Sequence, residues 1–194
     1  MLRSVFCFAL VLAVLSAPCL AKGVKVGDKA PAWSGIVGID DKQHGLADYD
    51  KAKAIVLVFT CNHCPVAVAY EDRLVALQRD YQDKGVQVIA VNVNNMPADR
   101  LDKMKERAAD KGFNFPYLYD ASQKMGRDYG ATCTPHFFVL DRDRNVVYTG
   151  AMDDNNTAAQ AKQPWLRDAL DAVLAGKAPA KTATTQRGCG IRYE

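Results

Sequence analysis

The sequence predicts a single α/β domain in which strands and helices alternate around one mixed sheet. Its 194 residues, 49% hydrophobic and 24% charged, suffice for one core and exclude a disordered, collagenous or multi-pass membrane chain. Apolar residues recur with the period of a strand in some segments and of a helix in others, without a longer repeat. Such alternation is typical of strands joined by crossover helices.

The first 21 residues have the features of a secretory signal peptide. An early positive charge precedes an apolar run over residues 5–15, and small residues lead to a predicted cleavage after Ala21. The run is too short to span a bilayer. A lipid anchor on Cys19 is the alternative, which Pro18 in front of it disfavours. We therefore expect a periplasmic or secreted protein in a compartment where thiols form lasting disulfides.

Six segments have the pattern of strands, and the second is a continuous apolar run, as expected of a strand buried on both faces. The predicted strands are residues 35–39, 55–60, 86–93, 117–119, 136–140 and 145–148. Four amphipathic segments predict helices, three of which stop at a glycine. The predicted helices are residues 66–84, 98–111, 122–129 and 164–174.

The chain divides into the signal peptide 1–21, a domain over residues 24–176 and a C-terminal tail over residues 177–194. Residues 177–187 are rich in Lys, Ala, Thr and Pro and have no apolar period, which is typical of an extended linker. An apolar, cysteine-bearing segment, 188–193, follows the linker. This order suggests an end that docks back on the domain, although free tails are the commoner outcome at termini.

A Cys-x-x-Cys motif, Cys61 to Cys64, stands where a buried strand ends and a long helix begins. Two intervening residues allow the sulfurs to close a small disulfide ring. Unpaired N–H groups and the helix dipole at a helix start stabilise a thiolate, lowering a cysteine pKa from about 8.5 to about 3.5–7.5. Cys61 is therefore predicted to be the attacking thiolate, with a pKa below that of a free thiol, and Cys64 the buried resolving cysteine.

His63 lies between the two cysteines, so a protonated imidazole there would favour the thiolate and make the disulfide a stronger oxidant. The alternative is a histidine that only faces solvent. Glu71 and Asp72, about two helical turns after Cys64, could relay protons, but we expect them on a solvated helix face.

Two metal sites are alternatives to redox chemistry at this pair. Zinc normally takes four ligands, and no second Cys-x-x-Cys or His-x₃-His is present, so zinc would need all four cysteines of the mature chain. Copper could bind the pair together with His136, as in carriers of the Sco type, although their cysteines are usually separated by three residues. We expect neither a metal nor another cofactor.

Several motifs together resemble the thioredoxin-like AhpC/TSA (redoxin) superfamily. They are VGDKAPAW at residues 26–33, LADY at 46–49, the Cys61–Cys64 pair and Thr134-Pro135 before an apolar strand. More narrowly, the chain is similar to a bacterial peroxiredoxin-like group often labelled thiol-disulfide isomerase. That similarity rests on TCNHCP at 60–65, FPYLYD at 115–120, GATCTP at 130–135 and the Gly188-Cys189 ending.

The resemblance implies a thioredoxin-like fold, a mixed central β-sheet flanked by helices with an N-terminal β extension. It also implies a disulfide redox centre at Cys61 and Cys64, faced by Pro135 in a cis peptide bond. The Thr134 backbone would then bind an extended substrate segment beside Cys61 by strand addition. Asn-His replaces the usual Gly-Pro between the cysteines, and its histidine position is shared with DsbA-type oxidants, which favours an oxidising potential.

A peroxidase is the alternative within the same superfamily, whose peroxidatic cysteine lies in P-x-x-x-(T/S)-x-x-C. Neither cysteine fits this motif. The two earlier positions are Ala54 and Val58 for Cys61, and Leu57 and Cys61 for Cys64.

Two roles compete for Cys133 and Cys189. They could form a structural disulfide that pins the tail, which export and the even cysteine count favour. Cys189 could instead reach the active pair as an exchange relay, since its linker is long enough to return to the domain.

The sequence thus predicts an exported, monomeric thiol-disulfide oxidoreductase that exchanges disulfides with protein substrates and a redox partner protein. Its catalytic residues are Cys61, Cys64, His63 and Pro135, and Thr134 binds substrate. A net charge of +3 is too small and scattered to favour nucleic acid or acidic lipid as a partner.

Overall fold

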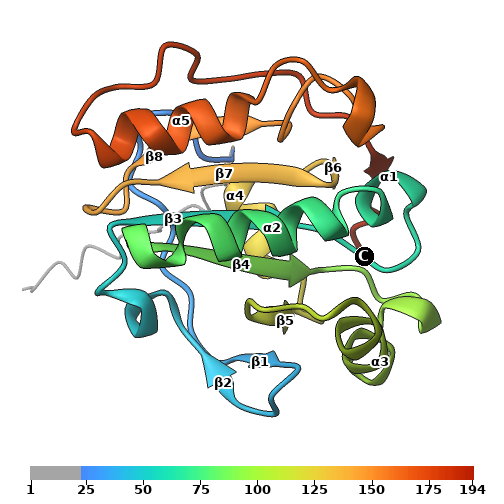
Figure 1. The fold of residues 1–194 in the computed structure, drawn as a ribbon. Helices are drawn as coiled ribbons and strands as arrows, with labels where there is room; N and C mark the ends of the chain where they lie inside the picture. The colour runs from blue at the N-terminus through green and yellow to red at the C-terminus, as the bar shows by residue number, and fades with distance from the viewer. Residues whose placement is uncertain (1–22) are drawn as a thin grey trace, which may run out of the picture.

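The structure is a computed structural model that describes residues 23–194, so the predicted signal peptide at 1–21 lies outside the described residues. Seven strands form one sheet in the order β2-β1-β5-β4-β3-β7-β8 (Figure 1). These strands are β1 (Ile36–Gly38), β2 (Gln43–His44), β3 (Ala54–Phe59), β4 (Val86–Asn92), β5 (Tyr117–Tyr119), β7 (His136–Leu140) and β8 (Val146–Gly150). The sheet is mixed, because β3, β4 and β5 run parallel whereas β7, β8 and the β1–β2 hairpin pair antiparallel.

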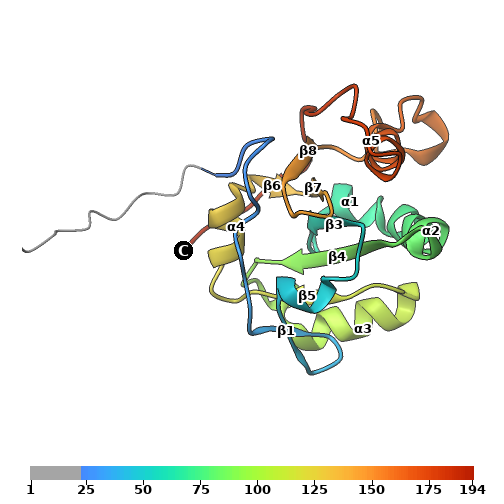
Figure 2. The ribbon, with the colours of Figure 1, turned by 90° about the vertical axis from the view of Figure 1, so that its left-hand side faces the viewer.

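Helices cover both faces of the sheet (Figure 2). The helices are α1 (Pro65–Val68), α2 (Glu71–Tyr81), α3 (Leu101–Lys111), α4 (Lys124–Tyr129) and α5 (Trp165–Leu174). Apolar residues of α2, α3 and α5 pack on one face, and those of α4 and the N-terminal segment pack on the other. All six residues of β3 are buried, since this strand lies between β4 and β7 and is covered on both faces. The expected mixed sheet with flanking helices and an N-terminal β extension is confirmed.

The long helix predicted over residues 66–84 is broken at Ala69 and Tyr70. Tyr70 has φ −99° and ψ −9°, and its N–H bonds the Ala67 carbonyl in a tight turn. The buried Tyr70 hydroxyl donates to Asp153 at 3.0 Å, and the Arg73 guanidinium stacks 3.7 Å from its ring centre. The Asp153 contact comes from a loop more than 80 residues away, which is why helical periodicity did not reveal the break.

The C-terminal tail returns along the domain and ends in a two-stranded sheet of its own. After α5 it runs beside β8, where Thr149 exchanges backbone hydrogen bonds with Thr182 and Thr184 at 3.0 Å each. Strand β9 (Cys189–Gly190) then pairs antiparallel with β6 (Cys133–Thr134). β2, β6 and β9 were not predicted, because strands of two residues show no periodicity. Within residues 23–194, no helix combines the length and apolar character needed to cross a membrane.

Candidate active site

The Cys61–Cys64 segment follows the carboxyl end of the central strand β3. Helix α1 begins only at Pro65, and Cys64 is its N-cap residue with extended backbone (φ −76°, ψ 119°). Cys61 therefore lies in the loop, one turn before a helix of four residues. Because the helix dipole acts only within the first turn, its effect on Cys61 is weaker than the sequence suggested.

Cys61 is a buried free thiol, with only 2% of its surface exposed. Burial raises its pKa, a hydrogen bond with the Thr134 hydroxyl at 3.0 Å opposes that rise, and the negative charge of Asp99 adds to it. The prediction of a lowered pKa is thus wrong for this arrangement. Desolvation penalises the thiolate more than the loop stabilises it.

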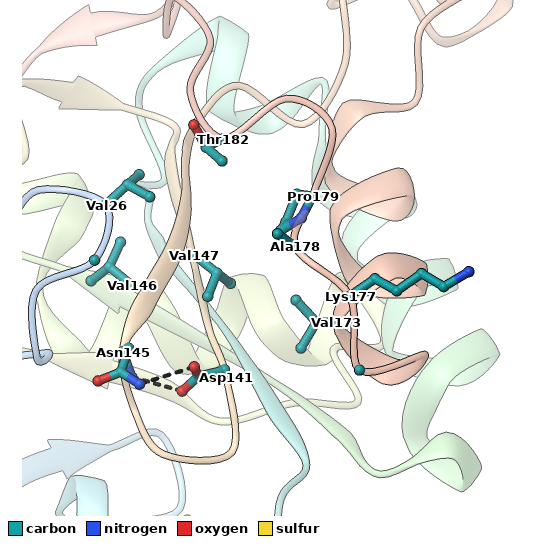
Figure 3. A pocket seen from close by; sticks show the side chains of 12 residues that line it. Val26, Asp141, Asn145, Val146, Val147, Val173, Lys177, Ala178, Pro179 and Thr182 are labelled. Atoms are coloured by element: carbon teal, nitrogen blue, oxygen red, sulfur yellow. Dashed lines mark hydrogen bonds between the residues drawn. The ribbon is translucent and has the colours of Figure 1, made fainter.

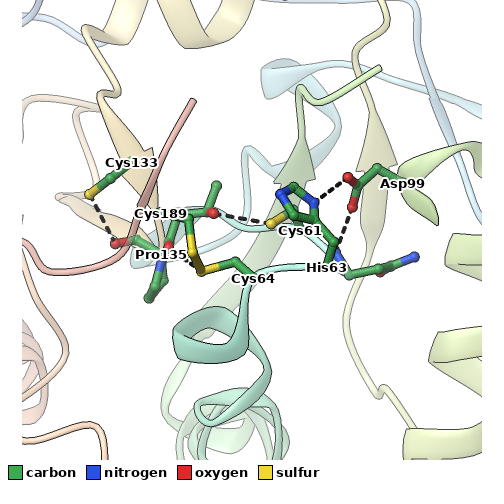
Figure 4. The surroundings of a disulfide bond; sticks show 9 residues. Cys61, His63, Cys64, Asp99, Cys133, Pro135 and Cys189 are labelled. Carbon is green, nitrogen blue, oxygen red and sulfur yellow. Dashed lines mark hydrogen bonds and ion pairs between the residues drawn. A yellow bond between two sulfur atoms is a disulfide. The ribbon is translucent and has the colours of Figure 1, made fainter. Parts of the chain in front are cut away.

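Asp99, which the sequence analysis missed, fixes the Cys-x-x-Cys loop through hydrogen bonds to Asn62 and His63. It is fully buried and accepts hydrogen bonds from the Asn62 backbone N–H at 2.8 Å and from the Asn92 side chain at 3.2 Å. His63 Nδ1 lies 2.5 Å from its other carboxylate oxygen (Figure 4). The sequence held a signal for Asp99: Asn92 is the last residue of β4, the parallel strand next to β3, and Asp99 lies in the segment that follows it. The carboxyl ends of such strands commonly form sites.

Tyr117 supports the same loop from β5. Its hydroxyl donates to Asn62 Oδ1 at 3.0 Å, and burial raises the pKa of Tyr117 well above its ordinary value. The hydroxyl therefore keeps its proton at neutral pH and donates it to Asn62. Asn62 is held through its backbone by Asp99 and through its side chain by Tyr117, so the loop between the cysteines has a defined conformation.

The peptide bond between Thr134 and Pro135 is cis, as expected from the resemblance. It lies between β6 and β7 and faces the cysteines. Thr134 contacts both of them: its hydroxyl bonds Cys61, and its carbonyl oxygen is 3.1 Å from the sulfur of Cys64.

The disulfide in the structure joins Cys64 to Cys189, with Cα atoms 5.9 Å apart (Figure 4). The favoured pairing of Cys133 with Cys189 is therefore corrected. Cys133 is a buried free thiol whose sulfur contacts the Pro135 carbonyl oxygen at 3.8 Å. In the β6–β9 register Cys189 lies opposite Thr134 rather than Cys133, which places it beside the active pair.

Cys61, His63 and Asp99 bring a thiol, an imidazole and a carboxylate within 4.8 Å of one another. Among residues 23–194 this is the one cluster of three potential metal ligands. His136, the copper ligand considered above, is not part of it. Its Nε2 bonds the Thr149 hydroxyl at 3.0 Å, whereas its buried Nδ1 has no partner.

Glu71 is buried, contrary to the expected solvated helix face, because Arg107 of α3 binds its two carboxylate oxygens at 2.8 and 2.7 Å. This ion pair between Glu71 and Arg107 links α2 to α3. Asp72, its neighbour, is exposed as expected.

Acid should destabilise the fold through His136. Burial lowers the pKa of His136 to about 4, below the value of about 6.5 expected in the unfolded chain. The unfolded state then binds the proton first, so stability is complete above pH 6.5 and falls as the pH drops toward 4, by up to about 3 kcal/mol. Urea unfolding of wild type and His136→Gln between pH 4 and 7 measures this. An equally steep loss in the variant would assign the acid sensitivity to other groups.

A pocket of about 470 Å³ lies apart from the cysteines, between β8, the turn at Val26 and the chain that follows α5 (Figure 3). Its walls are mostly apolar. The Asp141 carboxylate at its edge already accepts bonds from the side chain and backbone of Asn145. None of the cysteines or histidines among the described residues lines this pocket.

The redoxin family model matches residues 25–164. The chain belongs to the redoxin family. A thiol-disulfide oxidoreductase ResA of Geobacillus thermodenitrificans is 31% identical over 134 residues, covering 66% of this chain and 72% of that protein.

Solved structures agree on the fold. A hypothetical protein of Sinorhizobium meliloti has a TM-score of 0.83 and 32% identity, covering 89% of this chain and 97% of its own. A thioredoxin domain of a thiol-disulfide oxidoreductase from Bacteroides vulgatus has a TM-score of 0.59 and 16% identity, covering 71% of this chain and 95% of its own, which bears on the fold alone. The redoxin-family chain is an oxidoreductase with a thioredoxin-like fold.

Proposed function

We propose that this chain is an exported thiol-disulfide oxidoreductase that exchanges disulfides with protein substrates through Cys61 and Cys64. The observation that carries the proposal is the placement of the Cys61 sulfur against Thr134, beside a strand edge on which a cysteine-bearing segment lies. An extended segment of a substrate would bind the same edge by strand addition, which brings its disulfide to Cys61.

The exchange proceeds in two steps. The Cys61 thiolate attacks one sulfur of the substrate disulfide, forming a mixed disulfide and releasing the other substrate sulfur as a thiolate. The Cys64 thiolate, which the redox partner protein has freed by reducing the Cys64–Cys189 disulfide, then attacks Cys61 and displaces the second substrate thiolate. The substrate gains two electrons and the Cys61–Cys64 pair loses them; the reverse sequence donates a disulfide.

His63 and Asp99 supply the proton transfer in this proposal. His63 takes the proton from the buried Cys61 thiol as a general base, and Asp99 orients the imidazole through the 2.5 Å contact with Nδ1. This role replaces helix-dipole activation, which is weak at Cys61. The enzyme acts as a monomer on protein substrates outside the cytoplasm. A separate redox protein returns the Cys61–Cys64 pair to the oxidation state it had before the exchange.

Trapping of mixed disulfides tests the proposal. In Cys64→Ser/Cys189→Ser, Cys61 has no partner within the pair or the tail, so mixed disulfides with substrates should accumulate. The matched control, Cys61→Ser/Cys189→Ser, keeps Cys64 instead and should accumulate few. Both are expressed with residues 1–22 included, and non-reducing gels and mass spectrometry of the exported fraction identify the adducts and the mature N-terminus. Equal adducts in both variants, or none in either, would contradict exchange through Cys61.

A further inference from the structure

The C-terminal strand β9 occupies the edge of β6 where the proposed function places the substrate. Thr134 lies opposite Cys189 and Cys133 lies opposite Gly190, and the Ile191 N–H donates to the Thr132 carbonyl at 3.0 Å. A substrate segment that added a strand here would make the same bonds. The tail therefore binds as an extended substrate would, with its cysteine at the active pair.

Gly188 allows the close approach of the tail to the cis-proline segment. A Cβ on Gly188 would lie 2.5 Å from the Thr134 carbonyl carbon, 3.0 Å from the Pro135 nitrogen, and closer still to the Thr134 carbonyl oxygen. These are backbone atoms, which cannot move aside as a flexible side chain would. A Cβ on Gly190 would meet only the Thr132 carbonyl oxygen, at 4.0 Å. The site thus requires glycine at 188 and tolerates alanine at 190.

Contacts on both sides of Cys189 hold the tail in place. Before it, the Thr184 hydroxyl accepts a hydrogen bond from the Ala151 N–H at 2.9 Å. After it, Gln123, the N-cap residue of α4, donates to the Arg192 carbonyl at 2.9 Å, and the Tyr193 hydroxyl donates to the Ala131 carbonyl at 2.7 Å. The anchored ends keep Cys189 near the active pair when the disulfide opens, which raises its effective concentration above that of a diffusing thiol.

We propose, resting on the proposed function, that Cys189 is a third redox cysteine and that its strand competes with substrates for the active site. When Cys61 and Cys64 form a disulfide, the Cys189 thiolate attacks the sulfur of Cys64. The Cys64–Cys189 bond forms, the Cys61–Cys64 bond breaks, and the Cys61 sulfur leaves as a thiolate that accepts the proton lost by Cys189. No electrons are gained or lost overall, so the oxidised enzyme has two isomers.

The two isomers differ in what they offer a substrate. In the isomer with the Cys64–Cys189 disulfide, the tail is closed: β9 covers the edge of β6, here called the docking edge. Cys61 is then an almost fully buried thiol and Cys64 is fully buried, whereas Cys189 is partly exposed. With the tail open, the edge is free and the Cys61–Cys64 disulfide faces the substrate. A substrate must therefore displace the tail, and an external thiol meets the closed isomer first at Cys189.

Disulfide mapping of the oxidised full-length protein tests this. Wild type and Gly190→Ala, the matched control, are expected to carry mainly the Cys64–Cys189 disulfide after equilibration with oxidised glutathione and acid quenching. In Gly188→Ala the ratio of Cys64–Cys189 to Cys61–Cys64 should fall at least about tenfold, because the added methyl group overpacks the docking edge. Circular dichroism confirms that the variants are folded, and Cys189→Ser supplies the reference for an enzyme whose oxidised form can carry only the Cys61–Cys64 disulfide.

Each outcome separates the two proposals. An unchanged ratio in Gly188→Ala, or a wild-type protein that carries only Cys61–Cys64, would overturn the role of Cys189 and leave the proposed function standing. A Cys189→Ser protein that forms the Cys61–Cys64 disulfide would overturn the proposed function if it neither transfers that disulfide to protein thiols nor, once reduced, reduces a protein disulfide such as those of insulin. Faster exchange with reduced, unfolded protein thiols in Cys189→Ser than in wild type supports both.

Discussion

Replacing Cys61 by serine is expected to lower kcat/KM for disulfide exchange by at least about 1,000-fold, because a hydroxyl cannot form the mixed disulfide. The Cys61 sulfur bonds the Thr134 hydroxyl at the edge of β6, whereas Cys64 is fully buried and acts as the resolving cysteine, so no other sulfur takes its place at the substrate. Reduction of insulin disulfides by the prereduced enzyme measures the effect.

Cys133→Ser is the matched control for that loss. Cys133 is also a buried free thiol in the same region, but its sulfur contacts the Pro135 carbonyl rather than the active pair. The serine variant is therefore expected to retain exchange. Comparable losses in the two variants would show that the measured effect reflects damage to the fold around β6 and not the chemistry of Cys61.

The second large effect concerns stability. Phe138→Ala is expected to lower the free energy of unfolding by about 3–5 kcal/mol, because a large aromatic side chain leaves a cavity in a close-packed core. Phe138 lies in β7, three residues after Pro135, and is 1% exposed. Its ring centre lies 5.9 Å from Phe59, 5.4 Å from Tyr129 and 4.5 Å from His136.

Urea unfolding measures this loss, with Phe113→Ala as the control. Phe113 is only partly buried beside α3, where water fills much of the space that truncation creates. A smaller loss is expected there. A Phe138→Ala loss no greater than that of Phe113→Ala would contradict the assignment of Phe138 to the central core.

Two site features could be predicted from the sequence. The buried strand β3 is a continuous apolar run, so the Cys-x-x-Cys motif could be placed at its end within one residue. The cis bond before Pro135 followed from a resemblance carried by short motifs. The strand end is a property of neighbouring residues, whereas the cis bond was implied by the family resemblance and not by the residues around Pro135.

The surroundings of the pair depended on distant segments. Asp99 reaches His63 across 36 residues, and Asp153 helps to break the predicted long helix from 83 residues beyond Tyr70. The raised pKa of Cys61 comes from burial between elements that are separate in the chain. Local patterns carry no information about such desolvation, which is why the helix-start argument led to the wrong direction for this pKa.

Strand periodicity, the Cys-x-x-Cys spacing and the family motifs thus sufficed for an α/β redox domain with Cys61 and Cys64 at the end of its central strand. The partner of Cys64 was decided only by tertiary structure, because Cys189 lies 125 residues further along the chain. The even number of cysteines had favoured Cys133 as the partner of Cys189. Cys133 lies near Cys189 in the fold, but in the β6–β9 pair it stands opposite Gly190, one position away. A shift of one residue along a strand turns a side chain to the opposite face, and such a register is set by backbone pairing and by the fit of Gly188 against Thr134.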